Sequence, residues 1–179
     1  MNSREQILAA ILKNQPESCA LPEVGIFRRE EAGLPEKFVS VLETIGGKAY
    51  MVESVDKIPG IVKQYFANVN RMVTSLPELQ VTGIEAIDIS LDPHLLENID
   101  LAILESPLAV AENAAVWVTE DIVKERVLPF ICQYLAMVIQ KKDIVATMHH
   151  AYEKIGNADY GFGTFIAGPS RVVAERSQA

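Results

Sequence analysis

Glu112 and Asn113 are the residues of this chain with the clearest potential for chemistry. They stand in a stretch of small and apolar residues, between two runs that predict strands, at residues 100–104 and 114–118. A carboxylate with apolar neighbours is partly desolvated, which raises its pKa and suits a general acid, a general base or a nucleophile. The alternative interpretation is a solvated turn between two strands, in which neither side chain takes part in chemistry.

A second candidate is the glycine-rich segment at residues 161–171. Its glycines allow the backbone to approach a ligand closely, and residues 168–170 follow a short predicted strand and could open a helix. The free N–H groups of such a helix, with a hydroxyl and a guanidinium beside them, suit a carboxylate or a phosphate. The segment lacks the Gly-Lys-Ser/Thr ending of a Walker loop, so an ordinary glycine-rich turn is the alternative. The predicted ligand-binding residues are Asn113, Gly161, Gly163, Thr164, Gly168, Ser170 and Arg171.

Neither the histidines nor the cysteines predict a metal site. His149 and His150 are adjacent on a predicted helix and point in different directions, so a buried, hydrogen-bonded His149 is the simpler interpretation. His94 lies in a predicted surface turn. Cys19 and Cys132 are far apart in the sequence, and an iron–sulfur cluster needs about four thiolates. We therefore expect two free thiols and no metal, cluster or other cofactor in this chain.

Composition and charge narrow the classes of partner. The chain has 179 residues, a formal net charge of −8 and a pI near 4.9. Binding to phosphates along a polymer requires clustered Lys and Arg, so neither nucleic acid nor an anionic membrane surface is expected as the main partner. No apolar run approaches the roughly 20 residues that a membrane span needs. We expect a soluble, cytoplasmic protein without a membrane span.

The order of the predicted elements indicates an α/β fold. Residues 1–34 are expected to form an amphipathic helix, capped by Ser3, and an extended arm, and residues 35–179 to form the α/β domain. In the domain, short apolar strands alternate with helices, the last of which is expected to be capped by Asp143. This alternation predicts an open, mostly parallel sheet with helices on both faces. In such sheets ligands bind at the carboxyl ends of the strands.

Three segments of the chain resemble the lactate utilisation protein C family, whose members are built on a single LUD domain. They are Ile103-Leu104-Glu105, the sequence VAENAAVWV at residues 110–118, and GFGTFIAGPSR at residues 161–171. A weaker similarity extends from Leu135 to Tyr152. The resemblance covers roughly the C-terminal half, and the N-terminal half is similar only in its alternation of strands and helices.

The resemblance implies a fold like that of the CoA-transferase and ribose-phosphate-isomerase superfamily. It also implies a role in the oxidation of L-lactate to pyruvate, beside partner subunits that carry the iron–sulfur clusters. In the wider superfamily a glutamate can act as a nucleophile and glycine-rich turns hold phosphate or CoA, so these roles would fall to Glu112 and to residues 161–171. The family usually has an acidic residue shortly after Gly-Pro-Ser, and here that position is Ala174, which indicates a reduced or altered ligand.

Three hypotheses for the function follow. In the preferred one, the chain is an accessory, ligand-binding subunit in organic-acid metabolism: Arg171 and the amides of residues 168–170 hold an anionic metabolite, and Glu112 with Asn113 lines the opposite wall of the same crevice. In the second, the chain is an enzyme in its own right, with Glu112 as nucleophile or base in acyl, CoA or isomerase-type chemistry. In the third, it is a structural protein with a decayed site, which forms a homodimer through a sheet edge or the N-terminal arm.

Overall fold

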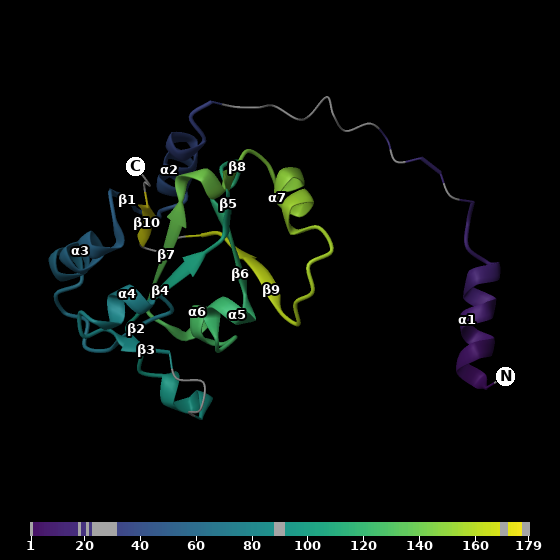
Figure 1. Ribbon diagram of the computed structural model, residues 1–179, viewed down its shortest axis with the longest axis horizontal. Coiled ribbons are helices and arrows are strands. Elements are labelled where there is room, and N and C mark those ends of the chain that lie inside the picture. The colour runs from purple at the N-terminus through teal and green to yellow at the C-terminus, as the bar shows by residue number, and fades with distance from the viewer. Residues whose placement is uncertain are drawn as a thin grey trace.

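Two β-sheets, with helices packed on their outer faces, form the body of the protein (Figure 1). The computed structural model describes residues 2–17, 19–20, 22, 32–87, 92–168 and 172–176. The helices are α1 (Ser3–Lys13), α2 (Leu34–Thr44), α3 (Ile58–Tyr65), α4 (Pro77–Gln80), α5 (Glu120–Val123), α6 (Leu128–Ile131) and α7 (Met148–Ile155), with the 3-10 turns η2 (Val55–Lys57), η3 (Pro93–Leu96) and η4 (Lys141–Asp143). The strands are β1 (Ala49–Val52), β2 (Met72–Thr74), β3 (Glu85–Ala86), β4 (Leu101–Ser106), β5 (Leu108–Val110), β6 (Ala115–Thr119), β7 (Tyr134–Gln140), β8 (Ile144–Val145), β9 (Gly163–Ile166) and β10 (Val172–Arg176).

The larger sheet has six strands in the order β1-β10-β7-β4-β2-β3, all of them parallel. Its central strands β4 and β7 are apolar at nearly every position because both faces of the sheet are covered. Ile103 and Val138 face α3 and α4 on one side. Leu104 and Met137 face the opposite side and contribute to the main core. The predicted α/β fold with a mostly parallel sheet is therefore confirmed.

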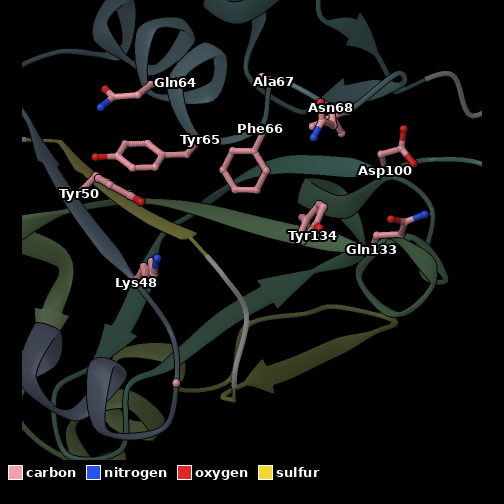
Figure 2. Close-up of a pocket in the computed structure, with 12 residues that line it drawn as sticks. Lys48, Tyr50, Gln64, Tyr65, Phe66, Ala67, Asn68, Asp100, Gln133 and Tyr134 are labelled. Carbon is pink, nitrogen blue, oxygen red and sulfur yellow. The ribbon is translucent and has the colours of Figure 1, made fainter.

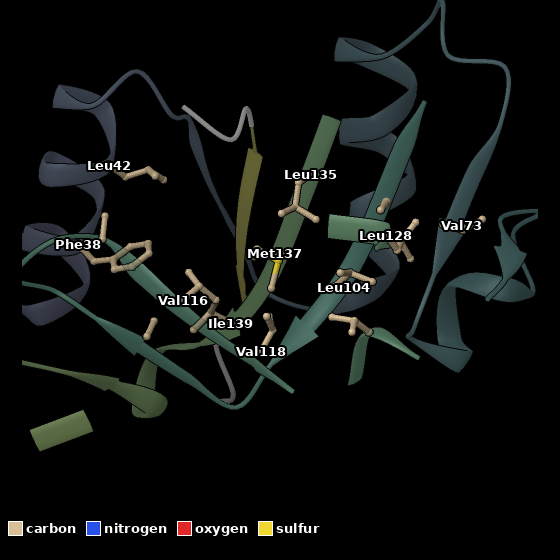
Figure 3. Close-up of a cluster of buried hydrophobic side chains, with 14 of the residues drawn as sticks. Phe38, Leu42, Val73, Leu104, Val116, Val118, Leu128, Leu135, Met137 and Ile139 are labelled. Carbon is tan, nitrogen blue, oxygen red and sulfur yellow. The ribbon is translucent and has the colours of Figure 1, made fainter. Parts of the chain in front are cut away.

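The smaller sheet covers much of that opposite side, where the sequence predicted helices. Its order is β8-β5-β6-β9, with β6 antiparallel to both β5 and β9. Val116 and Val118 of β6 pack with Met137 in the core between the two sheets (Figure 3). The alternate residue Trp117 points outward, toward α7. The layers are thus α3 and α4, the six-stranded sheet, the four-stranded sheet together with α2, and α7.

Pro107 and Ser106 explain why the chain leaves the first sheet for the second. Proline has no N–H to donate to a neighbouring strand, so it separates β4 from β5. The Ser106 hydroxyl is buried at the junction, and its one proton is donated to the carbonyl oxygen of Trp117, at 2.6 Å, or to that of Leu108, at 2.9 Å. The sharp change of direction is therefore stabilised by a satisfied buried polar group.

The N-terminal helix α1 lies apart from the body of the protein (Figure 1). Its cap is Asn2 and not the predicted Ser3: the Asn2 side chain accepts from the backbone N–H of Glu5 at 2.9 Å, and the Glu5 carboxylate accepts from Asn2 N at 3.0 Å. This is a capping box one residue earlier than expected. The apolar stripe that the sequence shows on this helix is exposed, and it consists of Ile7, Leu8, Ile11 and Leu12.

Two further predictions are corrected by strand pairing. The last helix, α7, begins at Met148 under a Thr147 cap, and not after Asp143, because residues 144–145 pair with β5 as strand β8. Residues 172–176, along which the predicted helix would have continued, form strand β10, between β1 and β7. Pro35 lies in the first turn of α2, where its missing N–H costs no helical hydrogen bond.

Candidate functional site

Glu112 and Asn113 lie in the turn between β5 and β6, and both side chains are exposed. The Glu112 carboxylate accepts a hydrogen bond from Met148 N, the first residue of α7, at 3.0 Å. The Asn113 side chain accepts from Ala115 N at 3.1 Å and so stabilises the turn itself. The expected desolvation of Glu112 is wrong, because the turn projects into solvent. The observed contact holds a helix end, where a carboxylate is favoured by the free N–H groups.

Gly163 is required by packing against an aromatic ring, whereas Gly161 stands next to the end of a flexible side chain. A Cβ on Gly163 would stand 2.5 Å from the indole ring of Trp117, and one on Gly161 would stand 2.5 Å from a carboxylate oxygen of Glu120. The Glu120 carboxylate accepts from Gly161 N at 2.9 Å and pairs with Arg126. These hydrogen bonds, first that from Arg126, lower the pKa of Glu120. Thr164, next along the chain, pairs with Val118 in the sheet.

The remaining predicted anion-binding residues are only partly described. Gly168 has a positive φ of 146° and open space where a Cβ would stand. Ser170 and Arg171 lie outside the described residues, so their proximity to Glu112 stays a prediction. Strand register places Gly161 and Glu112 at opposite ends of β6, because Gly163 pairs with Thr119 while Ala115 follows the Glu112 turn. The predicted residues therefore do not form one cluster in the described structure.

The histidine and cysteine side chains occupy ordinary positions. His149 is exposed, and it is His150 that is partly buried, with its Nδ1 3.0 Å from the Thr147 hydroxyl. Cys19 and Cys132 are both free thiols, and burial raises the pKa of Cys132 to about 11. Within the described parts of the chain, no three His, Cys, Asp or Glu side chains come together as a metal site would require. None of the described helices has the length and apolarity of a segment that crosses a bilayer.

A cleft of about 680 Å³ opens elsewhere, at the amino ends of β1, β7 and β4 (Figure 2). In the register of the sheet, Ala49, the first residue of β1, is in line with Met137 of β7 and Leu104 of β4, with strand β10 lying between β1 and β7. Since β4 begins earlier, at Leu101, the sheet edge is stepped at this point. The end of α3 and residues 66–69 form the facing wall. The lining residues are Gly46, Lys48, Tyr50, Gln64, Tyr65, Phe66, Ala67, Asn68, Val69, Asp100, Gln133 and Tyr134.

Charged groups stand at the two ends of this cleft. Lys48, just before β1, is exposed and forms no ion pair with any residue that the structure describes. Asp100, just before β4, is fixed by two backbone donors: its Oδ2 accepts from Asn70 N at 2.7 Å and from Arg71 N at 3.1 Å. No described residue donates a hydrogen bond to the other oxygen, Oδ1. The cleft therefore offers an ammonium group at one end and an oriented carboxylate at the other.

Two aromatic pairs form the wall between these ends. The rings of Tyr50 and Tyr65 lie 4.8 Å apart, centroid to centroid, and those of Phe66 and Tyr134 lie 5.2 Å apart, edge to face. Burial, and secondly the proximity of Tyr65, raises the pKa of Tyr50. Its hydroxyl consequently stays protonated near neutral pH and can donate a hydrogen bond. Concave, partly apolar surfaces with a few convergent polar groups are typical of small-molecule sites.

No motif in the sequence indicates this cleft. Ligands were expected at the carboxyl ends of the parallel strands, whereas the cleft lies at their amino ends. Its residues come from four separate stretches of ordinary composition, residues 46–50, 64–69, 100 and 133–134. Only the relative positions of β1, β7 and β4 and the end of α3 bring them together, and no local motif records that arrangement.

Comparison with known proteins identifies the fold. The structure is similar to the crystal structure of a DUF162 family protein from Deinococcus radiodurans, with a TM-score of 0.64. The two sequences are 18% identical, and the match covers 81% of this chain and 96% of the other. No protein-family model matches the sequence, and no curated protein does. At this level of identity the similarity is one of fold: the protein has the α/β fold of a DUF162 family protein.

Proposed function

We propose that this protein is a ligand-binding subunit of the LUD type in organic-acid metabolism. In this role it holds a small anionic metabolite, while partner subunits with iron–sulfur clusters transfer the electrons. The more specific role is that of the protein C component in the oxidation of L-lactate to pyruvate. The similarity of fold to a DUF162 family protein supports the type of domain.

The observation that carries the proposal is the cleft with Lys48 at its rim. The Lys48 ammonium group, the Tyr50 hydroxyl and the Gln64 carboxamide line this cleft and provide donors for a carboxylate. The Gln133 carboxamide is a further donor, at the Asp100 end. Ser170 and Arg171 remain part of the proposal as predicted anion contacts. The alternative of an independent enzyme relied on a desolvated Glu112, and the exposed position of that carboxylate gives the alternative no support.

Calorimetric titration with L-lactate and pyruvate tests the binding role. We expect Lys48→Ala to weaken binding of both acids about tenfold, because the charge-assisted hydrogen bond is lost. Lys142→Ala is the matched control, since Lys142 is also exposed but lies just after the carboxyl end of β7, at the opposite end of the strands. Arg171→Ala measures the predicted second contact in the same series. If Lys48→Ala and Lys142→Ala weaken binding equally, the anion is not held in the cleft.

Affinity purification of the tagged chain from its native host tests the subunit role. We expect proteins with the visible absorption of iron–sulfur clusters to purify with it, and to be lost when the complex is dissociated by salt. Purification of the chain alone, from cells in which it is expressed at its native level, would argue against the subunit role and leave only ligand binding.

A further inference from the structure

We propose that the ligand of the cleft is a ring-bearing anion of the nucleotide type, with its phosphate at Lys48, its planar ring against the aromatic wall, and an amino group of that ring at Asp100. This inference rests on the proposed binding function of the same cleft and names the ligand class. It follows from the length of the cleft, from the aromatic wall and from the order of the charges along it.

The length of the cleft exceeds that of a three-carbon acid. Strands β1, β10, β7 and β4 are consecutive neighbours in the sheet, so the amino ends of β1 and β4 are three strand spacings apart, at least about 14 Å. Figure 2 shows Lys48 and Asp100 toward opposite ends, with the aromatic side chains between them. A lactate-sized anion at Lys48 leaves the rings and Asp100 unused. A nucleotide, in which a sugar joins a phosphate to a base, can contact all three, with an amino group of the base as the donor to Asp100.

The aromatic wall is formed before any ligand arrives. Tyr50 and Tyr65 hold each other in place across the gap between β1 and α3, as Phe66 and Tyr134 do across the gap to β7. Tyr65 is nevertheless 50% exposed, so part of its ring remains accessible. A preformed ring surface binds a planar group without the loss of side-chain entropy that ordering a flexible site would cost.

The charges determine the orientation of the ligand. Asp100 repels an anionic group and favours hydroxyl or amino donors, and its carboxylate is held in one position by the backbone N–H groups of Asn70 and Arg71. Lys48 attracts the anionic group at the opposite end. Because the two charges have opposite sign and stand at opposite ends of the cleft, they select a ligand that is anionic at one end and has hydrogen-bond donors at the other.

Calorimetric titration with AMP, ribose 5-phosphate, adenosine and pyruvate tests this inference on the full-length protein. We expect AMP to bind the most tightly of the four. Tyr65→Ala should lower the affinity for AMP about tenfold, the range found when a ring that stacks on a base is removed, and should leave ribose 5-phosphate unchanged. Lys48→Ala should weaken AMP and ribose 5-phosphate alike and leave adenosine unchanged.

The control is Tyr152→Ala, because Tyr152 is an equally exposed tyrosine on α7, away from the cleft. An affinity for AMP that equals that for ribose 5-phosphate, or one that Tyr65→Ala does not change, overturns the inference. If pyruvate then still binds and Lys48→Ala weakens that binding, the proposed organic-acid function is retained and only the inference of a ring-bearing ligand is lost. Tight binding of AMP with no binding of pyruvate supports the inference and removes the organic-acid role.

Discussion

Two regions of the molecule compare instructively: the β6–β9 corner of the smaller sheet, which carries the motifs, and the cleft at the amino edge of the larger sheet. The corner holds Gly161 and Gly163, which the sequence marks as exceptional, yet Gly163 is required by contact with the Trp117 ring and Gly161 lies against the Glu120 carboxylate. The cleft is lined by residues that no motif marks, and it has unoccupied hydrogen-bonding groups such as Lys48. A position can require glycine because a ligand approaches the backbone closely. It can equally require glycine because a neighbouring side chain of the protein does so.

The strongest test of this contrast is Gly163→Ala. The added methyl group would meet the Trp117 ring at 2.5 Å, and we expect the free energy of unfolding to fall by about 3 kcal/mol, as in overpacked cores. Urea unfolding measures the change. Gly60→Ala is the control, because the space around Gly60 is open and alanine stabilises a helix by about 0.5–1 kcal/mol relative to glycine. A Gly163→Ala protein as stable as the wild type would show that the corner can make room for a ligand.

The second test concerns Glu112, whose carboxylate accepts from the first N–H of α7. We expect Glu112→Ala to lower the free energy of unfolding by about 1 kcal/mol, as the loss of a helix cap does. Glu112→Gln retains an oxygen acceptor and should lose less. Glu97→Gln, at another exposed glutamate, is the control for charge alone. Equal stability of Glu112→Ala and the wild type would mean that this carboxylate is free for another role.

A third, smaller effect is the pH dependence contributed by Glu120. Its pKa is lowered in the folded protein by Arg126 and by Gly161 N, from the ordinary value of 4.5. The contribution to stability is therefore present above pH 4.5 and is lost as the pH falls through the folded pKa. Glu120→Gln should be less stable than the wild type at neutral pH, and the difference should shrink as the pH falls below 4.5 and through the folded pKa of Glu120. Asp121→Asn, on the same helix, is the control for the loss of one negative charge.

The smallest expected effect belongs to the polar residues of the cleft. Asn68 and Gln133 are exposed and line the cleft without holding the fold together. We expect Asn68→Ala and Gln133→Ala to change the free energy of unfolding by less than about 0.5 kcal/mol. Urea unfolding of both variants, beside Gly163→Ala, completes the comparison. A loss as large as that of Gly163→Ala would show that the cleft side chains are structural.

The fold was more predictable than the site. Alternating strands and helices predict the parallel sheet, since β4 and β7 are apolar on both faces, and Pro35 predicts the start of α2. The smaller sheet was not predicted, because residues 144–145 form a strand only through pairing with β5. Because residues 144–145 are in that strand, α7 begins later in the sequence than predicted, and its cap is Thr147 and not Asp143. Local patterns do not contain this information about distant partners.

The amino-acid sequence by itself determined which segments are apolar on one face and which on both, and hence the α/β class, because burial depends on periodicity that is written along the chain. The tertiary structure alone decided that Lys48, Tyr65 and Asp100 share a cleft. It also decided that Glu112 accepts a hydrogen bond at the start of α7 and does not line that cleft. The physical reason is that a cleft results from the stagger of strands β1 and β4, which are neighbours only through β10 and β7. Such an arrangement exists only once the sheet has assembled.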